Sequence, residues 1–343
     1  MVGRAAVDKI ATDALVAAGV PGVSVAIAKD GQLVYAKGYG VADVSTGEAM
    51  TVQHRLRIAS VSKPITATAI VQLAENGVIT LDDPVFGDNG WLGRGYGTLP
   101  YSSNLLGITI DHLLLHTSGG WGGTSDTMFT NPDFTSDELI TWTLDNFPPM
   151  TAPGTVHAYS NFGYCLLGRV IESATGQGYE GYVQSTLLAQ CGISDMQIAG
   201  DSVGERASGE VAYDGTNSTI GDPYGIPVRR MDSHGGWIAS ATDLLRFMVR
   251  IDQLADPTDV VRSDSVTAMT TGSAANPNYG RGWSLNGSNW FHTGRLGGTE
   301  SIVVRHDTGI SYAVIANGNG IDPDTLGRDM AYAVADWGTG TPL

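Results

Sequence analysis

The chain has 343 residues, 42% of them hydrophobic and 16% charged, enough apolar sequence for one large domain or two intertwined ones. The 19 Lys and Arg residues against 35 Asp and Glu residues give a net charge of -16. Such a surface repels phosphate backbones, so we expect no nucleic-acid partner. No apolar run approaches the roughly 20 residues of a membrane span, and no signal peptide is recognisable at the N-terminus. The location stays open between the cytoplasm and export with the leader removed.

The first part of the chain is predicted to form a helix, a β-hairpin and a second helix. Apolar residues recur at helical spacing between 7 and 18, which indicates an amphipathic helix. Strand-like runs over 23–28 and 32–38 flank Asp30-Gly31, a pair typical of hairpin turns. After an irregular segment over 42–57, the next helix begins near Ser60 and ends at Asn76-Gly77.

The middle and the end of the chain differ in their patterns. Residues 86–107 are rich in Gly, Tyr, Ser and Asn without periodicity, which predicts a long loop of the kind that often carries function. Residues 108–200 are predicted to be mostly helical. After them come a helix over 241–251 and short strands predicted over 282–285, 301–306 and 310–316. A hairpin turn at 307–309 joins the last two strands, and a final helix covers about 322–336.

These elements predict an α/β (α+β) fold, in which an antiparallel sheet is flanked by helices and a mostly helical domain is inserted. The sheet domain is expected to combine residues 1–77 with 201–343, and the helical domain to cover 78–200. A cleft between two such parts is a usual place for a small-molecule site.

The most informative local pattern is Ser60-Val61-Ser62-Lys63, at the start of a predicted helix. Residues at i and i+3 lie about 5–6 Å apart on one helix face, so the Lys63 amine can reach the Ser60 hydroxyl. A lysine removed from water loses its proton near neutral pH. It can then accept the proton of Ser60 and make that hydroxyl a nucleophile. The same residues also fit a surface lysine that follows a helix cap.

A second candidate motif is Tyr159-Ser160-Asn161, just before an apolar helix. A tyrosine close to a lysine ammonium is easier to ionise, so Tyr159 is a candidate general base and then general acid to the leaving group. Asn161 offers an amide that can hold the lysine and a substrate carbonyl. The alternative is an ordinary helix N-terminus with Ser160 as its cap.

A third candidate motif is His292-Thr293-Gly294, which leads into Arg295 between strand-like runs. Thr293 can donate a hydrogen bond, and Gly294 lets a substrate approach the backbone closely. The N–H of Arg295 can pair with that of Ser60 as an oxyanion hole. The alternative is an ordinary turn at the end of a strand.

The order and spacing of the three motifs resemble the serine β-lactamase and penicillin-binding-protein superfamily, whose signature is Ser-x-x-Lys, Tyr-x-Asn and Lys/His-Thr-Gly. The chain is most similar to the branch of class C β-lactamases, D-alanyl-D-alanine carboxypeptidases and family VIII esterases. The flanking segments that resemble this branch lie at 113–119, 160–168 and 235–244, and the resemblance covers residues 22–318.

The resemblance implies a β-lactamase/transpeptidase-like fold and acyl transfer without metal or cofactor. It implies that Ser60 attacks a carbonyl, that Lys63 and Tyr159 move protons, and that water hydrolyses the acyl-enzyme. It further implies that the substrate is bound by the side chain or backbone of Asn161, His292, Thr293, Gly294 and Arg295.

Two departures from the family pattern bear on the substrate. His292 replaces the lysine that most β-lactamases carry, and an ordinary histidine titrates near pH 6.5. Arg295 is expected to supply a positive charge only if its side chain turns inward. The 86–107 loop is longer than this branch usually shows, and we expect it to narrow the pocket.

We therefore expect a serine hydrolase that acts on small-molecule esters or on D-amino-acid peptides and amides. The alternatives are a β-lactamase that acts on lactams, and a penicillin-recognising sensor that deacylates slowly. The sequence leaves the oligomeric state open.

Four other signals either have simpler interpretations or are left open. Residues 200–204 match Gly-x-Ser-x-Gly around Ser202, but no strand and helix surround them, so we expect a turn. His112 and His116 have a spacing that metals use, and we expect them to be structural. Cys165 and Cys191 are left open between a disulfide and buried thiols. Four aromatic residues are left open between lining an acyl pocket and packing: Trp91, Tyr96, Trp121 and Trp237.

Overall fold

The computed structural model describes residues 3–338 and 340–343, and its centre is an antiparallel sheet. In the described residues this sheet is 8-stranded, with the order β11-β2-β1-β10-β9-β8-β7 and with β3 paired to β2. The strands are β1 (Gly22–Lys29), β2 (Gln32–Asp43), β3 (Glu48–Ala49), β7 (Ser284–Asn286), β8 (Asn289–Leu296), β9 (Thr299–Arg305), β10 (Ile310–Ala316) and β11 (Thr341–Pro342). Because β1 pairs with β10, the two ends of the chain share one sheet, as the sequence predicts.

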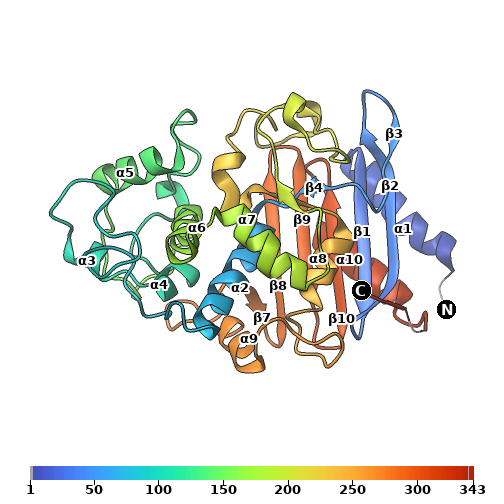
Figure 1. The fold of residues 1–343 in the computed structure, drawn as a ribbon. Helices are drawn as coiled ribbons and strands as arrows, with labels where there is room; N and C mark the ends of the chain where they lie inside the picture. Colours follow the sequence, from blue (N-terminus) through green and yellow to red (C-terminus); the bar gives the residue numbers. More distant parts are fainter. Residues whose placement is uncertain (1–2, 339) are drawn as a thin grey trace.

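Helices cover both faces of the sheet (Figure 1). Alternate residues of β1 face opposite ways: Val25 packs in one apolar core and Ala26 in the other. The first core also holds residues of α1 (Arg4–Ala18) and α10 (Pro323–Val334). The second core holds α2 (Ser62–Glu75) and α8 (Ala241–Met248). The predicted fold class is confirmed.

Helices α3 to α6 gather beside the sheet (Figure 1). The segment between α2 and α8 that carries them also has long irregular stretches, so less than half of residues 78–200 are helical, fewer than the sequence predicts. Its helices are α3 (Ser103–Leu106), α4 (Ile110–Leu114), α5 (Ser136–Asn146), α6 (Asn161–Thr175) and α7 (Tyr179–Val183). Apart from α3, residues 86–107 form no helix or strand, as predicted for a long loop.

A second, small sheet joins distant parts of the chain. It has the order β4-β6-β5, formed by β4 (Leu56–Arg57), β5 (Gln197–Ile198) and β6 (Trp237–Ala239). Tyr179 of α7 shares a hydrogen bond of 2.6 Å with Thr66 of α2 and accepts one of 2.9 Å from the Trp237 indole N–H. We propose that residues 78–200 form a helical part of the molecule, as the sequence suggests. The hydrogen bonds of Tyr179 join α7, its last helix, to the sheet part.

The sequence interpretation missed strand β8, which carries the His292-Thr293-Gly294 motif. Along β8 the buried positions are Trp290, His292, Gly294 and Leu296, which is the alternation of a strand with one buried face. A histidine and a glycine at inward positions hide this alternation in the sequence. The segment is therefore part of a strand and not a turn between strands.

Three further expectations concern the chain as a whole. None of the helices in the described part of the chain has the length and apolarity that crossing a membrane requires. Cys165 and Cys191 are buried free thiols, so the disulfide alternative is wrong. Met1 and Val2, where a removed leader would have joined, lie outside the described residues.

Candidate active site

Ser60 lies on a tight turn that the main sheet holds in place. The turn is the short 3-10 helix Ala59–Val61, which runs directly into α2. Ala59 has φ of 47°, a left-handed conformation that costs an alanine about 1 kcal/mol. From β9, the hydroxyl of Ser301 donates to the carbonyl of Ile58 at 2.8 Å. This support holds the backbone of the turn that carries Ser60.

Lys63 lies at the start of α2, and its side chain contacts three oxygen atoms. Its Nζ lies 3.1 Å from Ser60 Oγ, 2.7 Å from Asn161 Oδ1 and 2.9 Å from the carbonyl oxygen of His234. The lysine is completely buried. Burial lowers its pKa to about 7, although the nearby Asp126 carboxylate opposes this shift. The amine therefore exists partly in its neutral form at neutral pH.

The three oxygen contacts suit a neutral amine that acts as a base. A carbonyl oxygen only accepts hydrogen bonds, so the two N–H groups of a neutral Lys63 point at Asn161 Oδ1 and His234 O. The lone pair of Nζ then faces the Ser60 hydroxyl, which can donate its proton along this contact. After the proton moves, the same oxygen atoms stabilise the ammonium.

Asp126 is a site residue that the sequence analysis missed. Its Oδ2 accepts the backbone N–H of Asn161 at 2.5 Å, beside the N-terminus of α6 that Ser160 caps. The carboxylate also raises the pKa of Lys63, so it is a counter-charge for the ammonium form. Nothing near residue 126 in the sequence signals this role, because the contact joins residues 35 positions apart.

Tyr159 is placed as the sequence predicts, but its ionisation differs from the prediction. The Lys63 Nζ lies 4.7 Å from the centre of the Tyr159 ring. Burial raises the pKa of Tyr159 above its ordinary value, and the neighbouring Ser60 hydroxyl offsets this only in part. The expectation that lysine makes this phenol easier to ionise is wrong, because desolvation outweighs it. Tyr159 keeps its proton at neutral pH and can donate it.

The two histidines at metal-like spacing each accept a backbone N–H of the fold. His116 packs 4.4 Å from the Tyr159 ring, centre to centre, and its Nδ1 accepts the backbone N–H of Ser160 at 3.1 Å. His112 Nδ1 accepts the backbone N–H of Thr109 at 3.1 Å, which caps α4. No cluster of metal-ligating side chains occurs in the ranges that the structure describes.

His292 is buried and neutral, which corrects a second expectation. Its Nδ1 lies 2.7 Å from the carbonyl oxygen of Thr293 and therefore carries a proton. Its Nε2 lies 3.1 Å from the hydroxyl of Tyr279 and accepts from it. Burial and the nearby Lys63 lower the pKa of His292 to about 3. The titration near pH 6.5 expected for an ordinary histidine is absent here because the ring is desolvated.

Gly294 and Arg295 follow His292 on β8, and each has a different environment from the one expected. A Cβ on Gly294 would lie 2.1 Å from the carbonyl oxygen of Ile58, so glycine is required for β8 to pack against the turn of Ser60. The Arg295 guanidinium lies 2.9 Å from Glu300 Oε1 and donates to Thr219 Oγ1 at 2.9 Å. Its charge is therefore compensated by the protein.

Most of the predicted residues border one cavity of about 460 Å³. Lys63 lies behind Ser60, and Gly294 is covered by packing. In the part of the chain that the structure describes, no residue of 86–107 lines this cavity, so the expectation that the loop narrows it is wrong. Trp121 and Trp237 are fully buried packing residues, while Trp91 and Tyr96 border another pocket. The predicted residues that line the cavity are Ser60, Tyr159, Asn161, His292, Thr293 and Arg295.

Comparisons with known proteins show the family of this chain. The family model described as Beta-lactamase matches residues 7–336. The chain belongs to the Beta-lactamase family.

Three relatives show how far the similarity extends. The chain is 32% identical to esterase EstB of Burkholderia gladioli over 249 residues, which are 69% of this chain and 62% of EstB. It is 25% identical to a penicillin-binding protein of Bacillus subtilis (strain 168) over 307 residues, 82% of this chain and 65% of that protein. The octameric penicillin-binding protein homologue from Pyrococcus abyssi has the same fold: the TM-score is 0.78 at 24% identity, covering 98% of this chain and 78% of that chain. The chain thus spans less than two thirds of the length of both curated relatives.

The Gly-x-Ser-x-Gly motif lies outside the site of this family. Ser202 is exposed and precedes a short 3-10 helix over Val203–Glu205. Its hydroxyl donates to Glu205 Oε2 at 2.9 Å. The residues form a turn, as expected, because the short strand β5 ends at Ile198 and only a 3-10 turn follows Ser202.

Proposed function

We propose that this chain is a serine hydrolase that forms a covalent acyl-enzyme on Ser60. The observation that carries the proposal is the buried Lys63 amine, which has a pKa of about 7 and lies 3.1 Å from Ser60 Oγ. A base that is partly neutral at working pH and already bonded to the nucleophile meets both requirements of general base catalysis. Family membership supports this proposal.

In the acylation step, neutral Lys63 accepts the proton of Ser60 while Oγ bonds to the substrate carbonyl carbon. The carbonyl oxygen becomes an oxyanion, for which the backbone N–H groups of Ser60 and Arg295 are the donors, since both residues border the cavity. Asn161 Oδ1 and His234 O hold the resulting ammonium. Asp126 balances its charge.

In the leaving-group step, Tyr159 donates its proton to the departing oxygen or nitrogen and regains one from the Lys63 ammonium. Its raised pKa suits a donor better than a resting base. Water then repeats the sequence: its proton passes to the Tyr159 and Lys63 pair, its oxygen attacks the acyl carbon, and Ser60 leaves with a proton.

The charges around the cavity favour substrates without a carboxylate at the binding site. His292 is neutral, and Arg295 is compensated by Glu300. β-Lactams and D-alanyl-D-alanine peptides both carry a carboxylate that a lysine in the third motif would attract. We therefore propose esters and D-amino-acid amides, which lack a carboxylate, as substrates, in agreement with the similarity to a protein named an esterase.

The test is a substrate panel combined with intact-mass spectrometry. The panel compares p-nitrophenyl butyrate, a D-amino-acid amide, a D-alanyl-D-alanine peptide and nitrocefin. We expect the butyrate ester to be cleaved fastest, and acid-quenched enzyme to carry one butyryl group on Ser60. Undiminished turnover by the Ser60→Ala variant would contradict the covalent mechanism. A lasting adduct with a β-lactam and no hydrolysis of any ester would instead indicate a penicillin-recognising sensor.

A further inference from the structure

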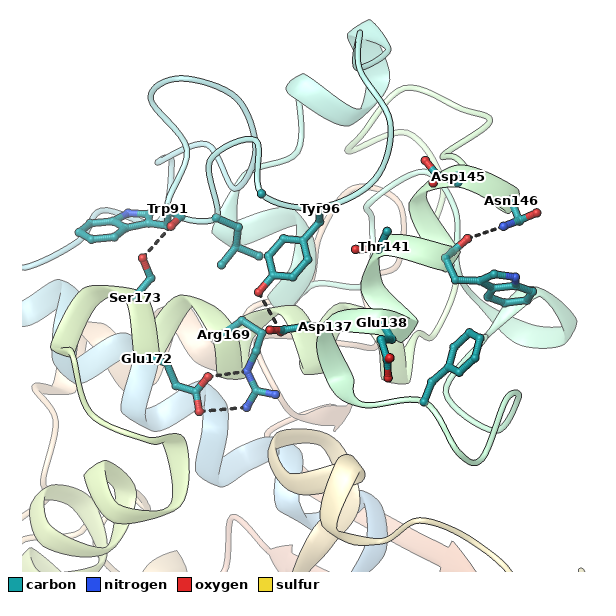
Figure 2. A pocket seen from close by; sticks show the side chains of 14 residues that line it. Trp91, Tyr96, Asp137, Glu138, Thr141, Asp145, Asn146, Arg169, Glu172 and Ser173 are labelled. Carbon is teal, nitrogen blue, oxygen red and sulfur yellow. Dashed lines mark hydrogen bonds and ion pairs between the residues drawn. The ribbon is translucent and has the colours of Figure 1, made fainter.

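The long loop over 86–107, which takes no part in the proposed catalysis, builds a second pocket. With α5 and α6 it borders an open pocket of about 940 Å³, and none of the described residues that line it also lines the catalytic cavity. Figure 2 shows the loop residues Trp91 and Tyr96 on one side, α5 residues such as Asp137 and Thr141 on another, and Arg169 and Glu172 of α6 at the base. The volume is in the range of pockets that hold small organic ligands.

Aromatic rings form much of the wall of this loop pocket. They come from three segments: Trp91 and Tyr96 from the loop, Phe134 from the turn before α5, and Trp142 from α5. All four rings are partly buried, because their other sides pack on the apolar core that holds α2 and α8. Trp91 is fixed by its indole N–H, which donates to Asp83 at 2.9 Å. The rings therefore offer apolar faces in fixed positions.

The charged groups of the loop pocket are mainly carboxylates. Arg169 is its cation, and Glu172 and Asp232 compensate it at 2.7 Å and 2.5 Å. In the chain as the structure describes it, no ion pair involves the other three carboxylates of the pocket; these belong to Asp137, Glu138 and Asp145.

Within the described residues, the hydrogen bonds to these three carboxylates come from neutral donors. Asp137 accepts the Tyr96 hydroxyl at 3.1 Å, and Asp145 accepts the Thr98 backbone N–H at 2.6 Å. Glu138 accepts the backbone N–H of Thr135 at 2.8 Å. A neutral donor leaves the negative charge in place, so the pocket keeps an excess of negative charge beside its aromatic faces.

We propose that the loop pocket binds a small organic cation, an ammonium group on an aromatic or alkyl body. Aromatic faces attract a cation through their quadrupole, and a partly desolvated contact contributes about 0.5–2 kcal/mol. The uncompensated carboxylates of Asp137 and Asp145 add charge attraction, and the net charge of -16 attracts cations to the whole molecule. An anion lacks such a partner, because Arg169 is already paired twice.

This binding site is separate from the reaction proposed above. Asn161 begins α6 at the catalytic cavity, and Glu172 lies 11 residues further along the same helix, about 16 Å away at 1.5 Å per residue. A ligand in the loop pocket therefore does not touch Ser60. The proposal stands or falls independently of the hydrolase function.

The test uses three probes that share a phenyl ring and differ in charge: 2-phenylethylammonium, 2-phenylethanol and 3-phenylpropionate. By isothermal titration calorimetry at low salt, we expect the ammonium to bind at least tenfold more tightly than the alcohol. The propionate should bind most weakly. The ammonium should bind equally well to enzyme whose Ser60 is blocked by a phosphonate ester, and 0.5 M NaCl should weaken its binding.

The decisive variant is Asp137→Asn/Asp145→Asn, in which the amide oxygens can still accept from Tyr96 and Thr98. We expect it to bind the ammonium at least fivefold more weakly and the alcohol unchanged. The matched control is Asp13→Asn/Asp264→Asn, which changes the net charge equally at exposed ion pairs elsewhere. Equal binding of ammonium and alcohol by the wild type, or equal weakening by both double variants, would overturn the proposal. Circular dichroism verifies that each variant is folded.

Discussion

The catalytic cavity and the loop pocket differ in whether their titratable side chains are buried or exposed to water. In the cavity, burial removes charge: Lys63 has a pKa near 7 and the pKa of His292 falls to about 3. In the loop pocket, Asp137 and Asp145 are exposed and keep neutral hydrogen-bond donors. A site that must move protons desolvates its titratable groups, whereas a site suited to hold an ion leaves its own charges in contact with water. The predictions below test whether this difference is real.

The largest effect is expected from Ser60→Ala, which removes the nucleophile. Loss of a nucleophile in a comparable hydrolase lowers kcat by about 10⁴-fold or more, and we expect the same for p-nitrophenyl butyrate. Ser202→Ala is the matched control, since Ser202 lies on an exposed turn and its hydroxyl donates to Glu205. If Ser202→Ala abolished hydrolysis and Ser60→Ala did not, the assignment of the cavity would be wrong.

The second effect concerns Lys63→Met, which removes the base and keeps the volume of the side chain. We expect about a 10³-fold loss of kcat/KM. The variant also tests whether Lys63 is buried as a neutral amine, because burial makes the free energy of unfolding depend on pH. The wild-type pKa falls from 10.5 to about 7 on folding, so between these values the unfolded chain binds one more proton and stability rises with pH.

This linkage predicts a measurable difference between wild type and Lys63→Met. The wild type should gain about 2–3 kcal/mol in unfolding free energy relative to the variant between pH 7 and pH 9, at about 1.4 kcal/mol per unit. Urea denaturation at the two pH values measures it. A pH-independent difference would show that Lys63 is ionised in the folded state.

The third effect is that of Tyr159→Phe, which removes the proton donor and preserves the packing against His116. We expect about a 10²-fold loss for amides and a smaller loss for p-nitrophenyl esters, because an amine leaving group needs a proton and a nitrophenolate does not. Steady-state kinetics on the two substrate classes measure this ratio. Equal losses on both classes would mean that Tyr159 acts elsewhere in the reaction.

The smallest effect is expected from Asp126→Asn, which removes the counter-charge and keeps an oxygen for the Asn161 N–H. The carboxylate raises the pKa of Lys63, so its loss lowers that pKa and increases the neutral fraction of the amine at acidic pH. The rising limb of the pH profile of kcat/KM should move to lower pH, with less than about a tenfold change at its plateau. A shift to higher pH would contradict this role.

The parts of the site that could be predicted are those fixed by local geometry. The spacing of Ser60 and Lys63 on one helix start, and Asn161 beginning another, follow from short patterns. The role of Asp126 could not be predicted, because its hydrogen bond with Asn161 forms only when the loop before α5 folds onto α6. The ionisation states also depend on burial, which a motif does not reveal: His292 and Tyr159 both deviated from their expected titration for this reason.

In the fold, too, the features fixed by local sequence could be predicted and those that depend on tertiary contacts could not. The hairpin of β1 and β2 and the amphipathic helices follow from turn residues and periodicity. Strand β8 was missed because His292 and Gly294 occupy its inward positions. The position of the 86–107 loop could not be inferred either, because its composition predicts irregular structure without indicating which helices it packs against. Only the tertiary contacts of Trp91 and Tyr96 place it at the second pocket.

The most direct test of the account is the titration of Lys63 itself. The chain has four lysines, Lys9, Lys29, Lys37 and Lys63, so protein labelled with ¹³C-lysine gives a spectrum simple enough to assign with Lys63→Met. We expect the Lys63 ε-carbon resonance to titrate with a pKa of about 7, some three pH units below the ordinary lysine value of about 10.4. A Lys63 resonance that titrates only near pH 10 would contradict the proposed base.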